Sequence, residues 1–169
     1  GLQMYTVLPF ESSSVYVGDP NRIRQVLVNL IGNAIKFTEA GDVTVALDVR
    51  SVNQSSIVEI SVSDTGIGIS PEAQECIFSA FSQANGSISR HFGGTGLGLS
   101  ISRQLVELMG GTLQLQSEEA KGSRFYFNLE LESRQVHLDT RTPLPELSIV
   151  AAIGRHKQRM AIEPMLQSW

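Results

Sequence analysis

A short stretch of the chain places two amides and an ammonium group at helical spacing. Asn29, Asn33 and Lys36 stand four and three residues apart, so on a helix their side chains fall within about 60° of one another. Amide oxygens are neutral, hard ligands that suit Mg²⁺, which takes the rest of its shell from waters and phosphates, and an ammonium group can neutralise a phosphate oxygen. The same spacing is also typical of a solvated polar stripe, so this pattern alone leaves both interpretations open.

A carboxylate followed by two glycines forms a second candidate group. Asp64 precedes Gly66 and Gly68 and lies beside the apolar residues Ile67 and Ile69. A carboxylate in an apolar pocket can accept a hydrogen bond from the amino group of an adenine, and glycines allow the backbone to approach a flat ligand closely. A lone Asp-Thr-Gly is nevertheless more often a simple turn.

The third candidate is the glycine-rich run Gly-Gly-Thr-Gly-Leu-Gly-Leu at residues 93–99, which opens a predicted helix. Free N–H groups at a helix N-terminus, together with the helix dipole, attract anions such as phosphate. The dinucleotide-binding fingerprint is excluded because Thr95 stands where a glycine is needed and no strand precedes the run. The Walker pattern is excluded because the chain contains no Gly-Lys-Ser/Thr.

Helices and strands that could position these groups are visible in the hydrophobic spacing. A helix is expected from Asp19-Pro20, an N-cap acid with a proline at the first position, to about Thr38. A short helix follows Ser70-Pro71, and another spans residues 97–109 before Gly110-Gly111. Strands packed on one side by helices, without strict alternation, predict an α/β two-layer sandwich. The expected strands are residues 15–18, 43–49, 57–62, 112–116 and 123–131.

Composition bounds the class of protein. The chain has 169 residues, 41% of them hydrophobic, with a net charge of −4, which suits a soluble globular domain. The acidic balance gives no basic surface of the kind that nucleic-acid binding needs. Cys76 is the only cysteine, so no intrachain disulfide forms, in keeping with a reducing compartment. No apolar run reaches the length of a membrane span, so direct membrane contact is not expected.

The motifs, in this order, resemble the nucleotide-binding boxes of two-component sensor histidine kinases, most closely the hybrid sensor kinases, over residues 1–132. The resemblance implies the Bergerat ATP-binding fold, shared with gyrase B, Hsp90 and MutL, with a mixed, mostly antiparallel sheet and helices on one face. The matching stretches are residues 29–38 for the N box, 64–69 for G1, 78–81 for F, 93–99 for G2, 122–125 for a closing strand and 87–90 for a Ser-x-Ser-Arg lid.

Carried onto this chain, the resemblance implies ATP and Mg²⁺ as ligands. Asn33 would ligate the metal, Asp64 would bind the adenine amino group with Ser123 behind it through water, and Phe81 would anchor the lid. Asn29, Lys36 and Arg90 would act on the phosphates as the catalytic group. The nucleotide-binding set is Asn29, Asn33, Lys36, Asp64, Gly66, Gly68, Ile69, Phe81, Gly94, Thr95, Gly96, Leu97, Gly98 and Ser123.

The residue at position 29 bears on the reaction. ATPases of this fold activate water with a glutamate four residues before the metal-binding asparagine, and here that position is Asn29. An amide does not titrate near neutral pH and cannot act as a general base. This favours transfer of the γ-phosphoryl group to a histidine. The alternative is a non-catalytic nucleotide-binding or partner-binding module that regulates another kinase.

The acceptor histidine is expected on a separate dimerisation and phosphotransfer domain, because His91, His137 and His156 lack the family's acceptor motif. We therefore expect a monomeric fragment that binds ATP without labelling itself and passes phosphate towards a downstream receiver domain in a phosphorelay. The resemblance implies a cytoplasmic domain of a protein anchored in the inner membrane.

The amino-acid composition changes after residue 132. Residues 133–146 are polar with two prolines and are interpreted as a linker. Residues 147–169 resemble the first strand and helix of a receiver domain, truncated, with Ile153 and Gly154 at the positions of its acidic pair. That would make it a degenerate receiver. The alternative is a disordered or swapped remnant, because a lone strand and helix cannot form a core.

Overall fold

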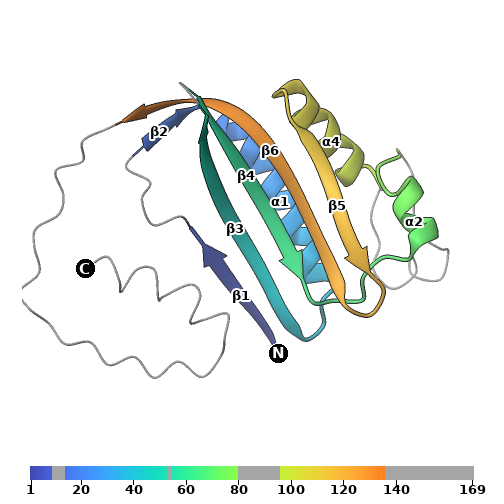
Figure 1. Cartoon of the computed structure of the whole chain (residues 1–169). Coiled ribbons are helices and arrows are strands. Elements are labelled where there is room, and N and C mark those ends of the chain that lie inside the picture. Colours follow the sequence, from blue (N-terminus) through green and yellow to red (C-terminus); the bar gives the residue numbers. More distant parts are fainter. Residues whose placement is uncertain (9–13, 53–54, 80–95, 136–169) are drawn as a thin grey trace, which may run out of the picture.

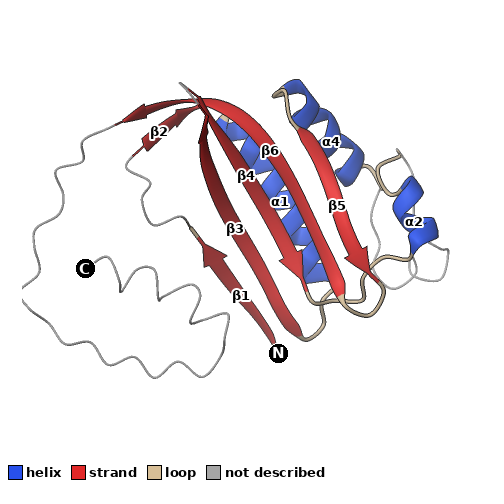
Figure 2. Ribbon diagram, viewed as in Figure 1, coloured by secondary structure: helices blue, strands red, loops and turns tan. Residues whose placement is uncertain are grey.

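The computed structural model describes residues 1–8, 14–52, 55–79 and 96–135. These residues form a six-stranded sheet with α1 and α4 on one of its faces (Figures 1 and 2). The elements in chain order are β1 Leu2–Val7, β2 Ser14–Val17, α1 Pro20–Lys36, β3 Gly41–Val52, β4 Ser55–Asp64, α2 Pro71–Cys76, α4 Gly98–Leu108, β5 Thr112–Glu118 and β6 Gly122–Gln135. The predicted two-layer α/β architecture is confirmed.

The sheet has the order β1-β3-β4-β6-β2, with β5 also paired to β6. Only β1 and β3 run parallel; the pairs β3–β4, β4–β6, β5–β6 and β2–β6 are antiparallel. The long strand β6 pairs with β5 between Gly122 and Asn128 and with β2 between Glu132 and Gln135. β2 and β5 therefore lie one after the other along the same edge of β6. The predicted mixed, mostly antiparallel sheet is confirmed.

Helix α1 begins as its sequence predicts. The side chain of Asp19 accepts hydrogen bonds from the main-chain N–H groups of Asn21 and Arg22, at 3.0 and 3.1 Å, which satisfies two of the donors that a helix start leaves open. Pro20 occupies the first turn, where its missing N–H costs nothing. The cap therefore fixes where α1 starts, and with it the positions of the amides further along the helix.

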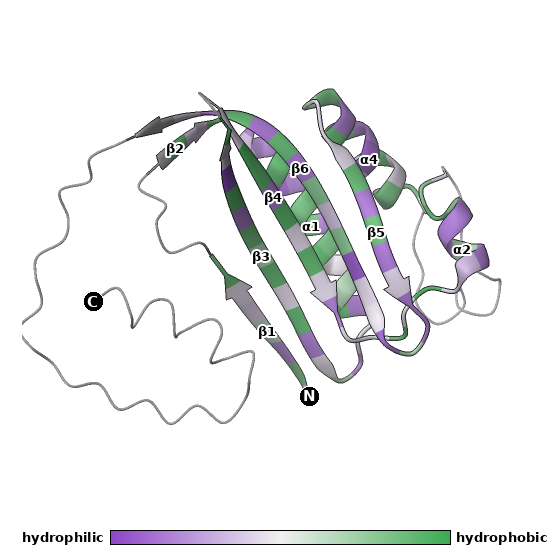
Figure 3. Ribbon diagram, viewed as in Figure 1, coloured by the Kyte–Doolittle hydropathy of each residue, from purple (hydrophilic) through white to green (hydrophobic). Residues whose placement is uncertain are grey.

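The core lies between the sheet and the two long helices. Hydrophobic and hydrophilic residues alternate along the strands (Figure 3), because successive side chains of a strand point to opposite faces. The most deeply buried hydrophobic side chains are Val26, Leu30, Val43, Val58, Val62, Val106, Phe127 and Leu129.

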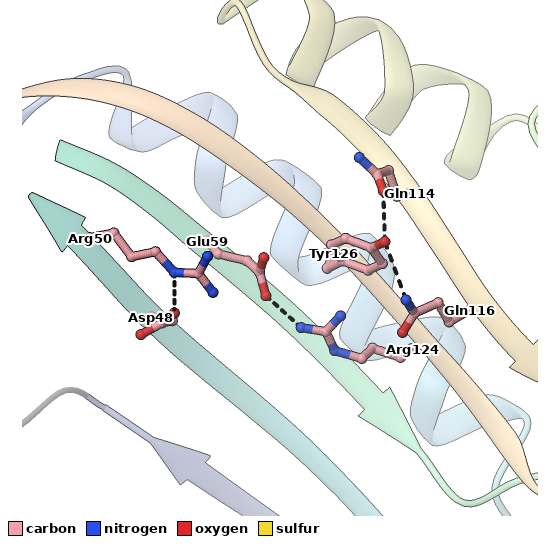
Figure 4. Close-up of polar contacts among 7 residues, drawn as sticks. All are labelled: Asp48, Arg50, Glu59, Gln114, Gln116, Arg124 and Tyr126. Carbon is pink, nitrogen blue, oxygen red and sulfur yellow. Dashed lines mark hydrogen bonds and ion pairs between the residues drawn. The ribbon is translucent and has the colours of Figure 1, made fainter. Parts of the chain in front are cut away.

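The other face of the sheet is polar (Figure 4). Arg124 on β6 forms an ion pair with Glu59 on β4 and lies 4.3 Å from the ring centroid of Tyr126. The Tyr126 hydroxyl donates to Gln114 on β5 at 2.6 Å. Cross-strand pairs of this kind stabilise the register of the strands. The residues predicted for the site lie elsewhere, at the end of β4 and on α1 and α4.

The structure extends several predicted elements. β1 was not expected from the sequence; it pairs with β3 alone, at the edge of the sheet. β3 and β4 are longer than predicted at both ends. β6 continues to Gln135, three residues past the expected boundary at 132. The remainder of the expected linker and the whole segment 147–169 lie outside the described residues. No helix in the described ranges is long and apolar enough to cross a membrane.

Candidate functional site

Asp64 is the last residue of β4 and its carboxyl group is partly buried. Burial raises the pKa of this carboxyl above its ordinary value of 3.8, and hydrogen bonds from the main-chain N–H groups of Gly66 and Ser123 offset part of that rise. The bond from Gly66 reaches Oδ1 at 2.8 Å. A carboxylate has about four acceptor positions, so Asp64 retains capacity for a ligand donor such as an exocyclic amino group.

The loop after Asp64 is held against the end of α1. A Cβ on Gly66 would lie well under 3.0 Å from the main-chain oxygen of Phe37 and 2.7 Å from the hydroxyl of Thr38. The N–H of Ile67 also donates to that Phe37 oxygen, at 3.3 Å. Glycine is therefore required at position 66 by the chain's own packing, because backbone cannot move aside as a side chain can.

The same loop is held on its other side by the turn between β5 and β6. Gly68 has φ of +68°, and a Cβ there would collide with the main-chain oxygen of Glu118. The N–H of Ala120 donates to the oxygen of Ile67 at 2.7 Å. Ile67 itself is 48% exposed, whereas Ile69 packs against the core. Of the two isoleucines expected around the carboxylate, only Ile69 is thus covered.

Two serines and a glutamine complete this side of the site. The Ser117 hydroxyl accepts from the Ile69 N–H at 2.9 Å and lies 3.0 Å from the Ser123 hydroxyl. Gln74 on α2 donates to the main-chain oxygens of Ile69 and Ser117, at 2.7 and 3.1 Å. Sequence reasoning named Ser123 but missed Ser117 and Gln74, because an alternating serine and a surface glutamine carry no signal of their partners.

The two amides on the polar edge of α1, Asn29 and Asn33, have different surroundings. The Nδ2 of Asn29 donates to the hydroxyl of Ser102 on α4 at 2.9 Å. Asn33 is half-buried, and its side chain makes no hydrogen bond to another described residue. Lys36, the last residue of α1, places its ammonium group 4.9 Å from the ring centroid of Phe37.

The start of α4 lies beside Asn29. A Cβ on Gly98, the first residue of α4, would collide with Oδ1 of Asn29. No side chain among the described residues caps this helix start, and N–H groups of a first turn are the donors that can bind an anion. Gly96 precedes it with φ of +67°, and the oxygen of Leu97 accepts from the Ser100 hydroxyl at 2.9 Å.

Predicted residues outside the described ranges are Phe81, Arg90, Gly94 and Thr95.

Helix α1 thus connects the predicted motifs in space. Its C-terminal end contacts the loop after Asp64, and its middle contacts the first turn of α4. Within the described part of the chain no group of three or more His, Cys, Asp or Glu side chains could hold a metal ion. A single amide oxygen such as that of Asn33 fits a Mg²⁺ ion that obtains its other ligands from phosphates and water.

Comparison with known proteins gives one family. The model of the Histidine kinase-, DNA gyrase B-, and HSP90-like ATPase family matches residues 18–133. Relatives include the signal transduction histidine-protein kinase BarA of Escherichia coli K12, 41% identical over 133 residues, and the sensor protein GacS of Pseudomonas syringae pv. syringae, 38% identical over 169 residues. These matches cover 78% and 98% of this chain but only 14% and 19% of BarA and GacS.

Among solved structures, full-length ShkA in complex with AMPPNP is similar at a TM-score of 0.64 with 34% sequence identity. The superposition covers 80% of this chain and 27% of ShkA. The chain therefore spans a small part of each relative, and the region shared with them contains Asp64, Asn29 and Asn33.

Proposed function

This chain belongs to the Histidine kinase-, DNA gyrase B-, and HSP90-like ATPase family, and on that premise we propose that it binds ATP with Mg²⁺ and transfers the γ-phosphoryl group to a histidine of a separate dimerisation domain. Its relatives are named histidine kinases, and the ShkA structure was solved with AMPPNP. Family and relatives support an ATP-binding kinase module; the metal and the acceptor histidine are the further steps that we propose.

The observation that carries the proposal is the pair of amides on α1. At Asn29, one turn before Asn33, the side chain is an amide already bonded to Ser102, so it offers no base to activate water. Asn33, by contrast, has an oxygen available to a metal. Positioning and charge neutralisation without a general base suit phosphoryl transfer to an external nucleophile better than hydrolysis.

Each group would have a defined role towards the bound nucleotide. The Asp64 carboxylate would accept a hydrogen bond from the adenine amino group, and Asn33 would hold the metal. Mg²⁺, when bound, would neutralise charge on the phosphates. The open N–H groups of α4 would bind phosphate oxygens, and Lys36 would supply positive charge at the C-terminal end of α1.

Calorimetric titration of the 169-residue protein with ADP, in the presence and absence of Mg²⁺, tests the binding step. We expect Asn33→Ala to abolish the part of the affinity that depends on Mg²⁺ and Asp64→Asn to weaken binding under both conditions. Asn21→Ala, an exposed asparagine in the first turn of the same helix, is the matched control and should bind as the unmodified protein does. Absence of nucleotide binding by the unmodified protein would refute the proposal.

The transfer step needs the acceptor supplied separately. With ATP labelled at the γ-phosphate, we expect label on an added dimerisation and phosphotransfer domain of the same kinase, and none on this chain alone. Label on this chain, or release of inorganic phosphate without an acceptor, would instead indicate self-phosphorylation or ATPase activity. Replacing the acceptor histidine of the added domain with alanine is the control.

The arrangement of the whole protein around this domain is also a proposal. We propose that the catalytic domain ends with β6 at Gln135, that the residues from there to 146 connect it to a degenerate receiver beginning at 147, and that the whole protein acts from the cytoplasmic side of the inner membrane. The match to GacS, which covers 98% of this chain, supports the view that the C-terminal stretch belongs to the same kind of protein.

A further inference from the structure

The contact between Asn29 on α1 and the first two turns of α4 is unusually specific. We infer that Asn29, Ser102 and Gly98 form an interhelical contact that sets the first turn of α4 relative to Asn33, so that Asn29 is a positioning residue and not a ligand of metal or phosphate. This inference rests on the proposed nucleotide-binding function.

The donor side of the contact is a partly buried hydrogen bond. Nδ2 of Asn29 donates to Oγ of Ser102 at 2.9 Å; Ser102 is only 2% exposed, whereas Asn29 is half-buried. Removing Asn29 therefore leaves the buried Ser102 hydroxyl without this partner, which costs stability. The bond joins two residues that lie 73 positions apart in the chain, so it acts between the helices and not within one.

The acceptor side of the same amide lies against a glycine. All three nearest atoms to a Cβ placed on Gly98 belong to the Asn29 side chain: Oδ1, Cγ at 3.0 Å and Nδ2 at 3.2 Å. The amide therefore occupies the space where any other residue would carry its Cβ. Gly98 and Ser102 stand one helical turn apart on α4, so together they form a recess that fits one planar amide.

The recess lies between the start of α4 and Asn33, the two parts of the site whose spacing the contact would set. Gly98 is the first residue of α4, where no described side chain caps the helix and where first-turn N–H groups would bind a phosphate under the proposed function. Asn33 lies one turn beyond Asn29 on α1, with no hydrogen bond to another described side chain. Holding Asn29 against α4 thus fixes the spacing between the phosphate-binding N–H groups and the metal-binding amide.

A double-mutant cycle on the 169-residue protein tests the inference. The variants are Asn29→Ala, Ser102→Ala and their combination, each titrated with MgADP and, separately, with adenosine. We expect each single variant to bind MgADP roughly 3- to 10-fold more weakly, the range that one neutral hydrogen bond supports, with adenosine affinity unchanged. The combined variant should lose no more than either single variant, because both remove the same contact.

Ser100→Ala is the matched control. Ser100 is also buried on α4, but its hydroxyl donates to the main-chain oxygen of Leu97, at the start of the same helix, and not to a residue of α1. We expect this variant to bind MgADP and adenosine as the unmodified protein does. Equal weakening of MgADP and adenosine by Ser102→Ala, additive losses in the cycle, or unchanged MgADP affinity in either single variant would overturn the inference.

Amide hydrogen exchange in the absence of nucleotide separates this inference from the proposed function. Loss of the contact should speed exchange in the first turn of α4 in Asn29→Ala and Ser102→Ala, and not in Ser100→Ala. If the unmodified protein binds no nucleotide, the proposed function fails and the role in binding fails with it, while the exchange data still decide whether the contact holds α4. Unchanged exchange in both variants would refute the contact itself.

Discussion

At the scale of single residues, the site depends on one carboxylate that the fold partly desolvates and two amides that the fold treats differently. Asp64 keeps hydrogen bonds from Gly66 and Ser123 but is buried enough for its pKa to rise. Asn29 donates a hydrogen bond to Ser102 on α4, whereas we propose Asn33 as the ligand of the metal. Residue type alone does not separate these roles, since both asparagines stand on the same face of α1.

The raised pKa of Asp64 predicts that stability and adenosine affinity change in opposite directions with pH. Because the folded state holds this proton more tightly than the unfolded state, the contribution of Asp64 makes the free energy of unfolding decrease as pH rises from about 3.8 through the raised pKa. Adenosine binding, which needs the carboxylate as acceptor, should instead strengthen over the same interval. Chemical denaturation and calorimetry across this range measure both.

Asp64→Asn is the control for that titration, since it removes the ionisable group and keeps a side-chain oxygen. Both pH-dependent changes should be absent from the variant when it is compared with the unmodified protein. A pH dependence of adenosine affinity that persists in Asp64→Asn would assign the effect to another group.

Gly66 in the site and Gly32 on the exposed side of α1 predict opposite effects of a glycine-to-alanine substitution. A Cβ at position 66 would collide with the backbone of Phe37, so Gly66→Ala should lower the free energy of unfolding by about 1–3 kcal/mol and weaken adenosine binding. Gly32, on the exposed side of α1, has no atom within 4 Å of such a Cβ. Gly32→Ala should raise the free energy of unfolding by about 0.5–1 kcal/mol, because alanine favours helix. Urea denaturation of both variants provides the comparison.

At the scale of elements, α1 is the common support of the site. It contacts the loop after β4 through Phe37 and contacts α4 through Asn29. The start of α1 is set by a cap, whereas its end is held against the loop after β4, where the Ile67 N–H donates to the Phe37 oxygen at 3.3 Å. A helix fixed at both ends holds its amides at constant positions relative to the sheet.

Removal of the N-cap should therefore cost stability. Asp19→Ala leaves the N–H groups of Asn21 and Arg22 without their acceptor, and we expect the free energy of unfolding to fall by about 1 kcal/mol. Asp48→Ala is the matched control, because Asp48 forms only an exposed ion pair with Arg50 and such pairs contribute about 0–1 kcal/mol. Equal losses in the two variants, measured by urea denaturation, would contradict a specific role of the cap.

The elements also show what sequence reasoning can reach. Proline, N-cap acid and apolar spacing predicted α1, and alternation predicted β3 and β4, because those signals are local. β1 carries no comparable signal, since its pairing with β3 is decided by a strand about 40 residues away. The types of Asp64, Asn29 and Asn33 pointed to the site, but the partner of Asn29 could not be predicted, because only folding brings Ser102 beside it.

At the scale of the whole molecule, stability rests on a single core between the sheet and the helices. Phe127 on β6 is fully buried there, whereas its neighbour Tyr126 lies on the polar face. Phe127→Ala should lower the free energy of unfolding by about 3–5 kcal/mol, a large share of the about 5–15 kcal/mol typical of a domain. Tyr126→Ala, which removes an exposed hydrogen bond and a ring contact, should cost far less. Urea denaturation distinguishes them.

The long strand β6 has a consequence for the order in which the protein can form during synthesis. Among the described strands, β2 and β5 pair with β6 alone, and β2 must wait for residues that follow it by more than a hundred positions, since Ser14 pairs with Gln135. Pairings between such distant segments form slowly. A growing chain that has not yet released β6 from the ribosome therefore holds β2, β5 and one side of β4 unpaired, and these pairings form only when β6 becomes available.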